Sequence, residues 1–266
     1  MRRDPRIGTR TCGIRIAVAV VLCLASMVVG AVAREILIPE ETTMQGDVAI
    51  AEWFYRTDVE GNTIARELQV WFREDGLREP DYFDTLILAS PGDVIVLSPG
   101  SYTADLWIYS PGITITTAQD PDSDEIVRAS IWGTVEIDAD RVVLDGIEVT
   151  GPRKHLSSGH GIVVNREVAR LVTIRNCRSV DNDWTGIHMI GARGQMAEMR
   201  VENCELSGNG MDGLDAQNID SVIITGCTVT GNGVAGLRIN RYINNLVLEN
   251  NIVTGNRAGD ITGSGI

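Results

Sequence analysis

Short runs of alternating hydrophobic and polar residues fill the second half of the chain and return at a nearly constant spacing. A Gly-Ile or Gly-Leu pair opens the repeats at Gly161, Gly186, Gly213 and Gly236, which are 25, 27 and 23 residues apart. Alternation over about four to six residues is typical of a β-strand with one buried face. A repeat of this length indicates a solenoid, in which each unit buries its apolar side by stacking on the next unit.

Each glycine run is followed by a second strand-like run and then by a turn that carries an asparagine. The second runs cover residues 172–177, 199–204, 222–227 and 246–251, and the asparagines are Asn182, Asn209, Asn232 and Asn256. Asparagine suits these turns because it tolerates left-handed backbone and can stack its amide along the solenoid axis. Several strands and no helix in each unit predict a parallel β-helix, and they fit poorly with leucine-rich or ankyrin repeats.

These units resemble the generic β-helix repeats of secreted bacterial and archaeal proteins, and the segment Ser90–Tyr102 resembles the usual entry into such domains. From Asp81 to Ile266 the chain is similar to the right-handed parallel β-helix superfamily typified by pectate lyases. The resemblance implies an all-β fold, a single-stranded right-handed parallel β-helix solenoid with a small N-terminal cap. It implies no single activity, because the superfamily includes lyases, hydrolases, epimerases and proteins with no known catalysis.

The first 33 residues have the composition of an export signal. Several arginines are followed by an apolar run, Ile16–Ala33, which ends in Ala31-Val32-Ala33. A basic region, an apolar region and an A-x-A site are the parts of a secretory signal peptide. The alternative is an uncleaved membrane anchor, since about 18 apolar residues just span a bilayer. Either way we expect a secreted, periplasmic or cell-surface protein, and a membrane is a partner only if this segment stays uncleaved.

Residues 34–89 are expected to form an extension that caps the open N-terminal end of the solenoid, which itself covers residues 90–266. Within the extension, Glu60-Gly61-Asn62 favours a hairpin turn between two strands. Four apolar residues between Ile64 and Phe72 also fit one face of a helix, so both structures are open for this stretch. Residues 81–89 are expected to form a short helix.

The net charge of the chain limits the kinds of molecule that it can bind. It is −13 for the whole chain, and cleavage after Ala33 would remove five arginines and one aspartate and lower it to −17. Nucleic acid and anionic membrane surfaces are therefore excluded as partners, since both require a basic face. A highly anionic polymer such as pectate would need a bridging Ca²⁺, the one cofactor that stays open. The acidic loop Gln119–Glu125 matches no calcium-loop spacing and is interpreted as a solvated loop.

Three cysteines occupy the same place in consecutive repeats: Cys177, Cys204 and Cys227. We expect them to point inward and to stack at the ~4.8 Å strand spacing. An odd number of thiols with parallel Cβ directions does not suit disulfide geometry. The sequence therefore predicts a ladder of buried free thiols with no metal or redox role.

Stacking the repeats in register predicts two outward columns of charged residues. One contains Asp145, Arg175, Glu202, Thr225 and Glu249, and the other contains Glu148, Arg178, Glu205 and Thr228. Opposite charges follow each other in both columns, and each pair contributes ~0.2–1 kcal/mol. We interpret these columns as structural.

A further outward column carries residues suited to chemistry: Glu136, Val163, His188, Asp215 and Arg238. The residues before the four repeat glycines add His160, Thr185, Asp212 and Ala235 on the adjoining turn. The longer loop 151–158 carries Lys154 and His155 and is expected to overhang this strip. One strip of parallel sheet thus offers bases, acids and cations on coils ~4.8 Å apart.

Such a set suits the cleavage of polysaccharide. Hydrolysis uses two carboxyl groups, one protonated and one ionised, which are roles open to Asp212 and Asp215. Elimination from a uronic acid needs a base for the C5 proton and a cation for the carboxylate, roles open to His188 or Lys154 and to Arg238. In related lyases and hydrolases the cleft lies along such a sheet. The expected catalytic set is His188, Asp215 and Arg238, with Lys154, His160 and Asp212 beside them.

The short motif Gly159-His160-Gly161 is similar to one found in polygalacturonase-like hydrolases. The paired aspartates of that group are missing, since residues 142–151 contain only Asp145, and Arg238-Ile239-Asn240 lacks the expected lysine. We interpret the match as chance. Two other functions stay open: binding of carbohydrate without catalysis, and a structural or accessory role in the cell envelope.

The sequence stops at residues 259–266, where a further repeat begins, and carries no polar or helical cap there. An open end would leave apolar residues and unpaired strand groups exposed. We therefore expect end-to-end self-association, a covering partner, or a longer natural chain.

Overall fold

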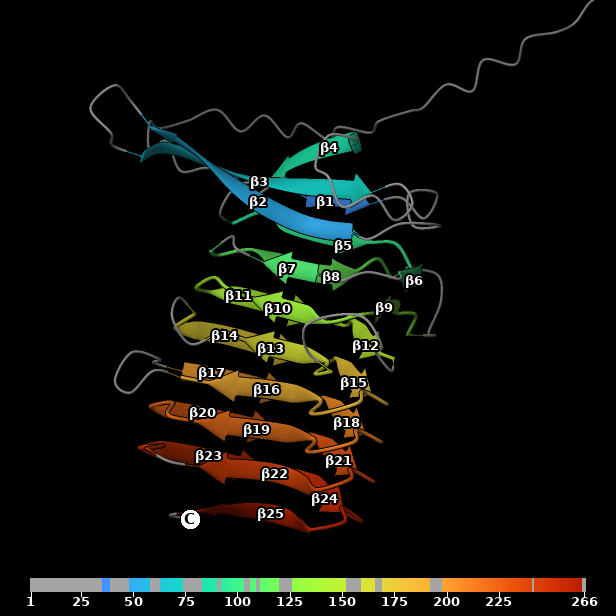
Figure 1. Cartoon of the computed structure of the whole chain (residues 1–266), viewed down its shortest axis with the longest axis vertical. Coiled ribbons are helices and arrows are strands. Elements are labelled where there is room, and N and C mark those ends of the chain that lie inside the picture. Colours follow the sequence, from blue (N-terminus) through green and yellow to red (C-terminus); the bar gives the residue numbers. More distant parts are fainter. Residues whose placement is uncertain are drawn as a thin grey trace, which may run out of the picture. The chain divides into compact units, whose positions relative to one another are not determined.

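The computed structural model describes residues 35–38, 48–57, 63–73, 83–89, 92–102, 106–108, 111–119, 126–151, 159–165, 169–191, 198–240 and 242–264. Of the two compact units of the chain, 1–31 and 32–266, these residues all belong to the second. They form strands and turns (Figure 1), and among them no helix is long and apolar enough to cross a membrane. The predicted signal segment, Lys154 and His155 lie outside the described residues.

Three parallel sheets wind into a β-helix, and each coil contributes one strand to each sheet. The first sheet contains β1 (Glu35–Ile38), β5 (Val94–Leu97), β8 (Thr114–Thr117), β11 (Val142–Asp145), β14 (Leu171–Arg175), β17 (Glu198–Glu202), β20 (Ser221–Thr225) and β23 (Asn245–Glu249). The second contains β6 (Gly100–Tyr102), β9 (Ala129–Trp132), β12 (Glu148–Thr150), β15 (Arg178–Val180), β18 (Glu205–Ser207), β21 (Thr228–Thr230) and β24 (Ile252–Thr254). The third contains β7 (Leu106–Ile108), β10 (Val135–Ile137), β13 (Ile162–Val164), β16 (Ile187–Ile190), β19 (Leu214–Gln217), β22 (Ala235–Asn240) and β25 (Gly259–Ser264).

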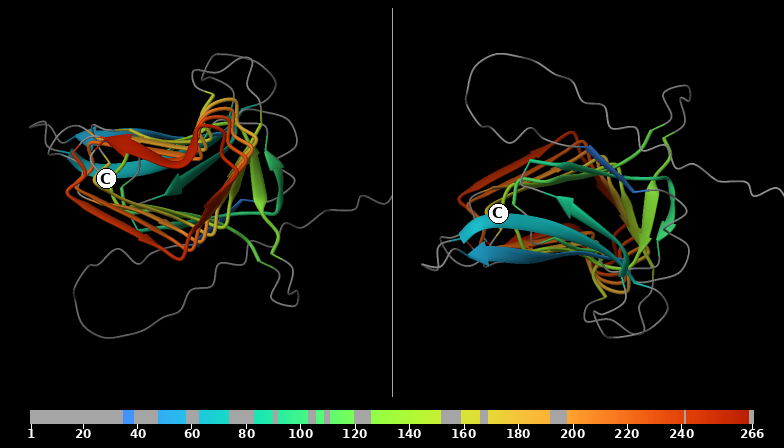
Figure 2. Two further views of the ribbon diagram at one scale, coloured as in Figure 1. Left: turned by 90° about the horizontal axis from the view of Figure 1, so that it is seen from below. Right: turned by 90° about the horizontal axis from the view of Figure 1, so that it is seen from above.

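The described coils run in sequence order, and the strands of successive coils superpose into three walls when seen along the stack (Figure 2). Coil 1 consists of β5, β6 and β7, coil 2 of β8, β9 and β10, and so on to coil 7, which consists of β23, β24 and β25. The prediction of a right-handed parallel β-helix is confirmed.

Alternation along each strand separates the core from the surface. In the third sheet the inward residues Val135, Ile162, Ile187, Leu214 and Leu237 pair from coil to coil and are at most 1% exposed. Burying such columns removes apolar surface from water on every coil at once, which is why the units are stable only when stacked. The outward residues occur in the predicted columns, with Asp145 paired to Arg175 and Glu148 to Arg178.

The turn asparagines form a buried ladder, as the sequence predicted. The side-chain Nδ2 of Asn182 donates to Oδ1 of Asn209 (2.8 Å), Asn209 to Asn232 (3.0 Å), and Asn232 to Asn256 (2.8 Å). The prediction of left-handed backbone at these residues was wrong. The left-handed residue is the preceding one in each turn: Asp181 (φ 54°), Gly208 (68°), Gly231 (67°) and Gly255 (71°).

Close packing against this ladder explains the repeat glycines. A Cβ placed on Gly186 would lie 2.7 Å from the carbonyl oxygen of Gly213 and 2.8 Å from Nδ2 of Asn209. Both contacts are shorter than a carbon atom tolerates, so only glycine fits between the third sheet and the ladder. The thiol ladder is also confirmed, since Cys177, Cys204 and Cys227 are free and buried.

The described parts of the N-terminal extension are strands. β2 (Val48–Thr57) and β3 (Thr63–Arg73) form the hairpin that the turn residues favoured, and the helical alternative for this stretch is wrong. The predicted helix at 81–89 is also wrong, because β4 (Phe83–Ala89) pairs antiparallel with β3. A short apolar run fits a buried strand as well as a helix, and here pairing with the neighbouring strand β3 favours the strand. β1 joins the first sheet by parallel pairing with β5.

Candidate functional site

The predicted catalytic residues lie together on the outer side of the third sheet and on the turn that leads into it. His188, Asp215 and Arg238 are register partners on β16, β19 and β22. His160 and Asp212 lie on the adjoining turns, where backbone N–H groups of Gly161 and Gly186 bond the carbonyl oxygens of Thr185 and Asp212. We call these five residues, with Gln217 and Trp184, the third-sheet strip.

His188 is held between an acid and a second imidazole. Its Nδ1 lies 3.6 Å from Oδ2 of Asp215, which is too long for a hydrogen bond, and this nitrogen is buried without a hydrogen-bond partner. Asp215 is 4% exposed and accepts from Nε2 of Gln217 at both carboxylate oxygens (3.1 and 2.9 Å). Because Nδ1 faces Asp215, the other ring nitrogen, Nε2, is the one left for a ligand.

His160 stacks on His188 and stays neutral near pH 7. The two ring centroids are 4.2 Å apart and the planes differ by 9°. The backbone N–H of Thr185 donates to Nδ1 of His160 (3.3 Å), so the proton of the neutral ring is on Nε2. Burial lowers the pKa of His160 to about 4, the charge of His188 adds to this, and Asp215 opposes it.

Asp212 and Arg238 form an ion pair at the edge of the strip. Nη2 of Arg238 lies 3.1 Å from Oδ2 of Asp212, and the backbone N–H of Ala235 donates to Oδ1 (2.9 Å). Burial raises the pKa of Asp212, whereas the Ala235 hydrogen bond and Arg238 lower it. The Asp212 side chain is 0% exposed and that of Arg238 is 29% exposed, so only the cation of this pair meets solvent.

Exposure decides which groups a ligand can reach. The side chain of His188 is 21% exposed and that of Asp215 is 6% exposed. The ionisable groups at the surface of the strip are therefore imidazole and guanidinium, and both carboxylates are buried behind them. This arrangement suits a base and a cation better than a pair of catalytic carboxyl groups, which both have to reach the sugar.

Trp184 is a candidate that the sequence analysis missed. It is 47% exposed and meets the ring of His160 edge-on, with centroids 5.1 Å apart and planes at 76°. The corresponding turn positions of the next coils hold Met211 and Val234, as the backbone bonds Met211 N–H to Trp184 O and Val234 N–H to Met211 O indicate. The sequence carried one signal for this candidate: a large aromatic residue at a turn position of the coil next to that of His160.

No group of three or more His, Cys, Asp or Glu side chains is arranged to hold a metal ion in the part of the chain that the structure describes. The involvement of Ca²⁺ stays a prediction. Lys154 and its loop lie outside the described residues, so their position over the strip also stays a prediction.

Comparison with known proteins identifies the fold family. Residues 132–266 match the family model described as the right-handed β-helix region. No curated protein and no solved structure matches the chain.

Proposed function

Since the chain belongs to the right-handed β-helix family, we propose that it is exported and cleaves a uronic-acid-containing extracellular polysaccharide by a lyase-like elimination at the third-sheet strip. The observation that carries the proposal is the partly exposed His188, with Nδ1 facing the buried Asp215, on the same outward column as the partly exposed Arg238.

His188 is the proposed base. The buried Asp215 faces its Nδ1, so Nε2 is the ring nitrogen that can take a proton from a substrate. Stacking on His160 restrains the ring further. In the elimination, Nε2 takes the proton from C5, the electron pair forms the C4–C5 double bond, and the C4–O bond breaks. The departing oxygen takes a proton from water.

Arg238 is the proposed partner of the substrate carboxylate. A guanidinium binds a carboxylate through two parallel N–H donors and stabilises the charge that develops when C5 loses its proton. Arg238 is two coils from His188, about 10 Å along the stack, so the two side chains can reach one uronate or its immediate neighbour. The chain as a whole is acidic, and Arg238 is the cation that the strip exposes to solvent.

A second candidate function is binding of carbohydrate without cleavage, and the exposed Trp184 favours it. An indole ring packs against the apolar face of a sugar while its edge stays in contact with water. Because Trp184 also contacts His160, binding and cleavage would use one surface.

A panel of polysaccharides tests the proposal, with and without Ca²⁺. Elimination is followed by the ultraviolet absorbance of the unsaturated uronate, hydrolysis by new reducing ends, and binding by affinity electrophoresis. We expect the His188→Ala variant to lose elimination activity by about 10²–10⁴-fold.

Arg175→Ala is the matched control for Arg238→Ala. Arg175 is an outward arginine paired with an aspartate in the first sheet (Nη2 to Oδ2 of Asp145, 2.8 Å). The control should keep full activity while Arg238→Ala loses it. Reducing ends without unsaturated product would refute the lyase chemistry, and retention of polysaccharide with no product would favour the binding function.

A further inference from the structure

A shallow hollow lies at the corner between the first and second sheets, separate from the third-sheet strip. Its volume is about 260 Å³, and it is lined by Arg128, Cys177, Arg178, Asn203, Cys204, Glu205, Gly226 and Thr228. Pockets for drug-sized ligands measure about 300–1,000 Å³, so this corner hollow has room only for a small molecule. The buried thiols give it an apolar floor, and the other side chains give it polar walls.

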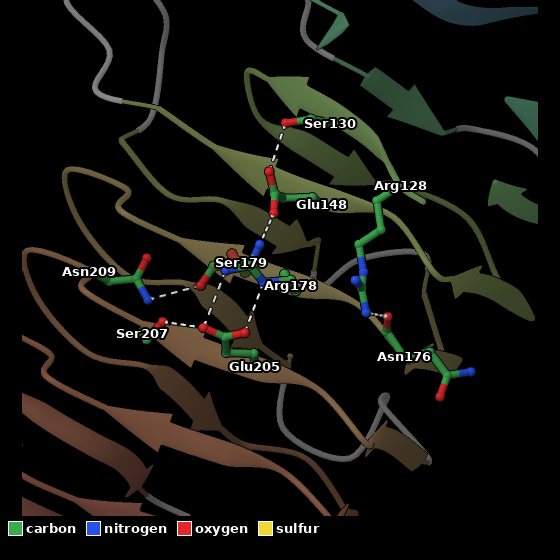
Figure 3. Close-up of polar contacts among 9 residues, drawn as sticks. All are labelled: Arg128, Ser130, Glu148, Asn176, Arg178, Ser179, Glu205, Ser207 and Asn209. Carbon is green, nitrogen blue, oxygen red and sulfur yellow. Dashed lines mark hydrogen bonds and ion pairs between the residues drawn. The ribbon is translucent and has the colours of Figure 1, made fainter. Parts of the chain in front are cut away.

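Arg178 is already paired with two carboxylates of the protein. It lies between Glu148 and Glu205 (Figure 3), bonding Glu148 through Nη1 and Glu205 through Nε (2.8 Å) and Nη2 (3.4 Å). Hydroxyl groups of Ser130 and Ser207 donate to the same two carboxylates (both 2.9 Å). The hydrogen bond from Arg178 lowers the pKa of Glu205, so this carboxylate is ionised and already satisfied.

Arg128 is not engaged in this way. It extends from coil 2 past coil 3 to coil 4 (Figure 3), where Nη2 makes one long hydrogen bond, 3.4 Å, to the carbonyl oxygen of Asn176. Its Nε is buried and has no hydrogen-bond partner, and Arg128 is in none of the ion pairs between described residues. Ordering a long side chain and burying an unbonded N–H each oppose folding, so the contacts between described residues do not account for this conformation.

We propose that the corner hollow binds a small hydroxy-carboxylate, such as a single sugar acid, through Arg128. The Nε–Nη2 edge of a guanidinium takes both oxygens of a carboxylate in parallel hydrogen bonds. Nε is buried, so binding through this edge requires the guanidinium to turn toward the hollow. Asn203 and Thr228 line the same hollow and supply an amide and a hydroxyl for the hydroxyl groups of the ligand.

The charges of the corner select a monoanion. The corner contains two guanidiniums and two carboxylates, those of Arg128, Arg178, Glu148 and Glu205, so its net charge is zero. A single carboxylate would meet Arg128, the arginine of this hollow that is in no ion pair between described residues. A phosphate dianion would bring twice the charge toward Glu205, which disfavours it.

Titration calorimetry with D-galacturonate, D-galactose and inorganic phosphate tests this site on the full chain. Galacturonate and galactose differ at C6, where the first has a carboxylate and the second a neutral hydroxymethyl group. We expect galacturonate to bind and the Arg128→Ala variant to bind it at least about tenfold more weakly, as loss of charge-assisted hydrogen bonds implies. Arg128→Lys keeps the charge but loses the two-donor edge, and should fall between the two.

One control variant separates this site from other arginines: Arg175→Ala, which removes an outward arginine paired with Asp145, should leave galacturonate affinity unchanged. Dependence of binding on Arg128 assigns it to the corner hollow and not to the strip, so failure of the proposed lyase function would not affect this result. Binding of an oligogalacturonate alone, still dependent on Arg128, would assign the carboxylate to a polymer instead of a free sugar acid. Equal affinity in Arg128→Ala, equal binding of galactose, preference for phosphate, or no binding by either uronate would overturn the proposal.

Discussion

Replacing Asn209 with alanine tests how much the buried amide ladder stabilises the coils. Asn209 is 1% exposed, and its Oδ1 accepts from the backbone N (3.2 Å) and Nδ2 (2.8 Å) of Asn182. Its Nδ2 donates to Oδ1 of Asn232 (3.0 Å) and to the carbonyl oxygen of Ser179 (3.1 Å). Alanine removes all four bonds and leaves buried polar groups on both neighbouring coils.

The size of the effect follows from which groups keep a partner. Nδ2 of Asn182 still reaches Oγ of Ser179 (3.2 Å), and Oδ1 of Asn232 still accepts from the backbone N of residue 209 (3.1 Å). The backbone N–H of Asn182 loses its side-chain acceptor, which costs about 1–3 kcal/mol, and the other three bonds contribute about 0.5–1.5 kcal/mol each. Together these terms span about 2.5–7.5 kcal/mol, and because bonds within one ladder are not additive we expect a loss of about 3–5 kcal/mol in the free energy of unfolding.

Urea unfolding followed by far-ultraviolet circular dichroism measures this loss. Asn244→Ala is the control, because Asn244 is exposed and makes one side-chain bond, from Nδ2 to Oδ1 of Asp220 (3.0 Å). It should change stability by less than about 1 kcal/mol. The double variant Asn209→Ala/Asn232→Ala should be less destabilised than the sum of its single variants, because both remove one shared bond. A loss below about 1 kcal/mol in Asn209→Ala would refute the reasoning.

Three further predictions follow from the same geometry. Gly213→Ala should lower the free energy of unfolding by about 1–3 kcal/mol, because the added Cβ would lie 2.7 Å from the carbonyl oxygen of Gly236. Gly255→Ala is the control: a Cβ there would meet no atom within 4 Å, so only backbone strain of about 1 kcal/mol is expected. The pKa of His160 is about 4 in the folded chain, below its ordinary value of 6.5. As the pH falls from 6.5 to 4, His160 is therefore protonated in the unfolded chain but not in the folded chain, and the free energy of unfolding decreases. Because solvent screens this half-buried ring, the loss of stability over this pH range should be about 1–2 kcal/mol. Chemical unfolding at several pH values measures the loss, which should be absent in the His160→Gln variant. The thiols of Cys177, Cys204 and Cys227 should react with Ellman's reagent only after denaturant is added, because all three are buried; rapid reaction in the native chain would contradict the buried ladder.

The repeating pattern of the sequence was sufficient for the architecture. In a solenoid each unit contacts only its neighbours, so the position of one glycine or cysteine in its repeat predicts its partner one coil away. For this reason the repeat alone predicts the register of His188, Asp215 and Arg238, and the structure confirms it. Outside the repeats no such guide exists, and the helix predicted for residues 81–89 was wrong because a single apolar run also fits the strand β4.

Only the tertiary structure decided which of those side chains are accessible. Register places Asp212 and Asp215 on the strip, but neighbouring side chains cover both, and this depends on rotamers and turn paths that no periodicity encodes. The edge contact of Trp184 with His160 and the reach of Arg128 across coil 3 arise in turns or at strand ends, where the repeats differ from one another. The sequence determined the stacked coils and their residue columns, because every coil repeats one local pattern. Burial and side-chain contacts at the turns depend on how the differing turns of neighbouring coils pack together, and only the folded structure shows this packing.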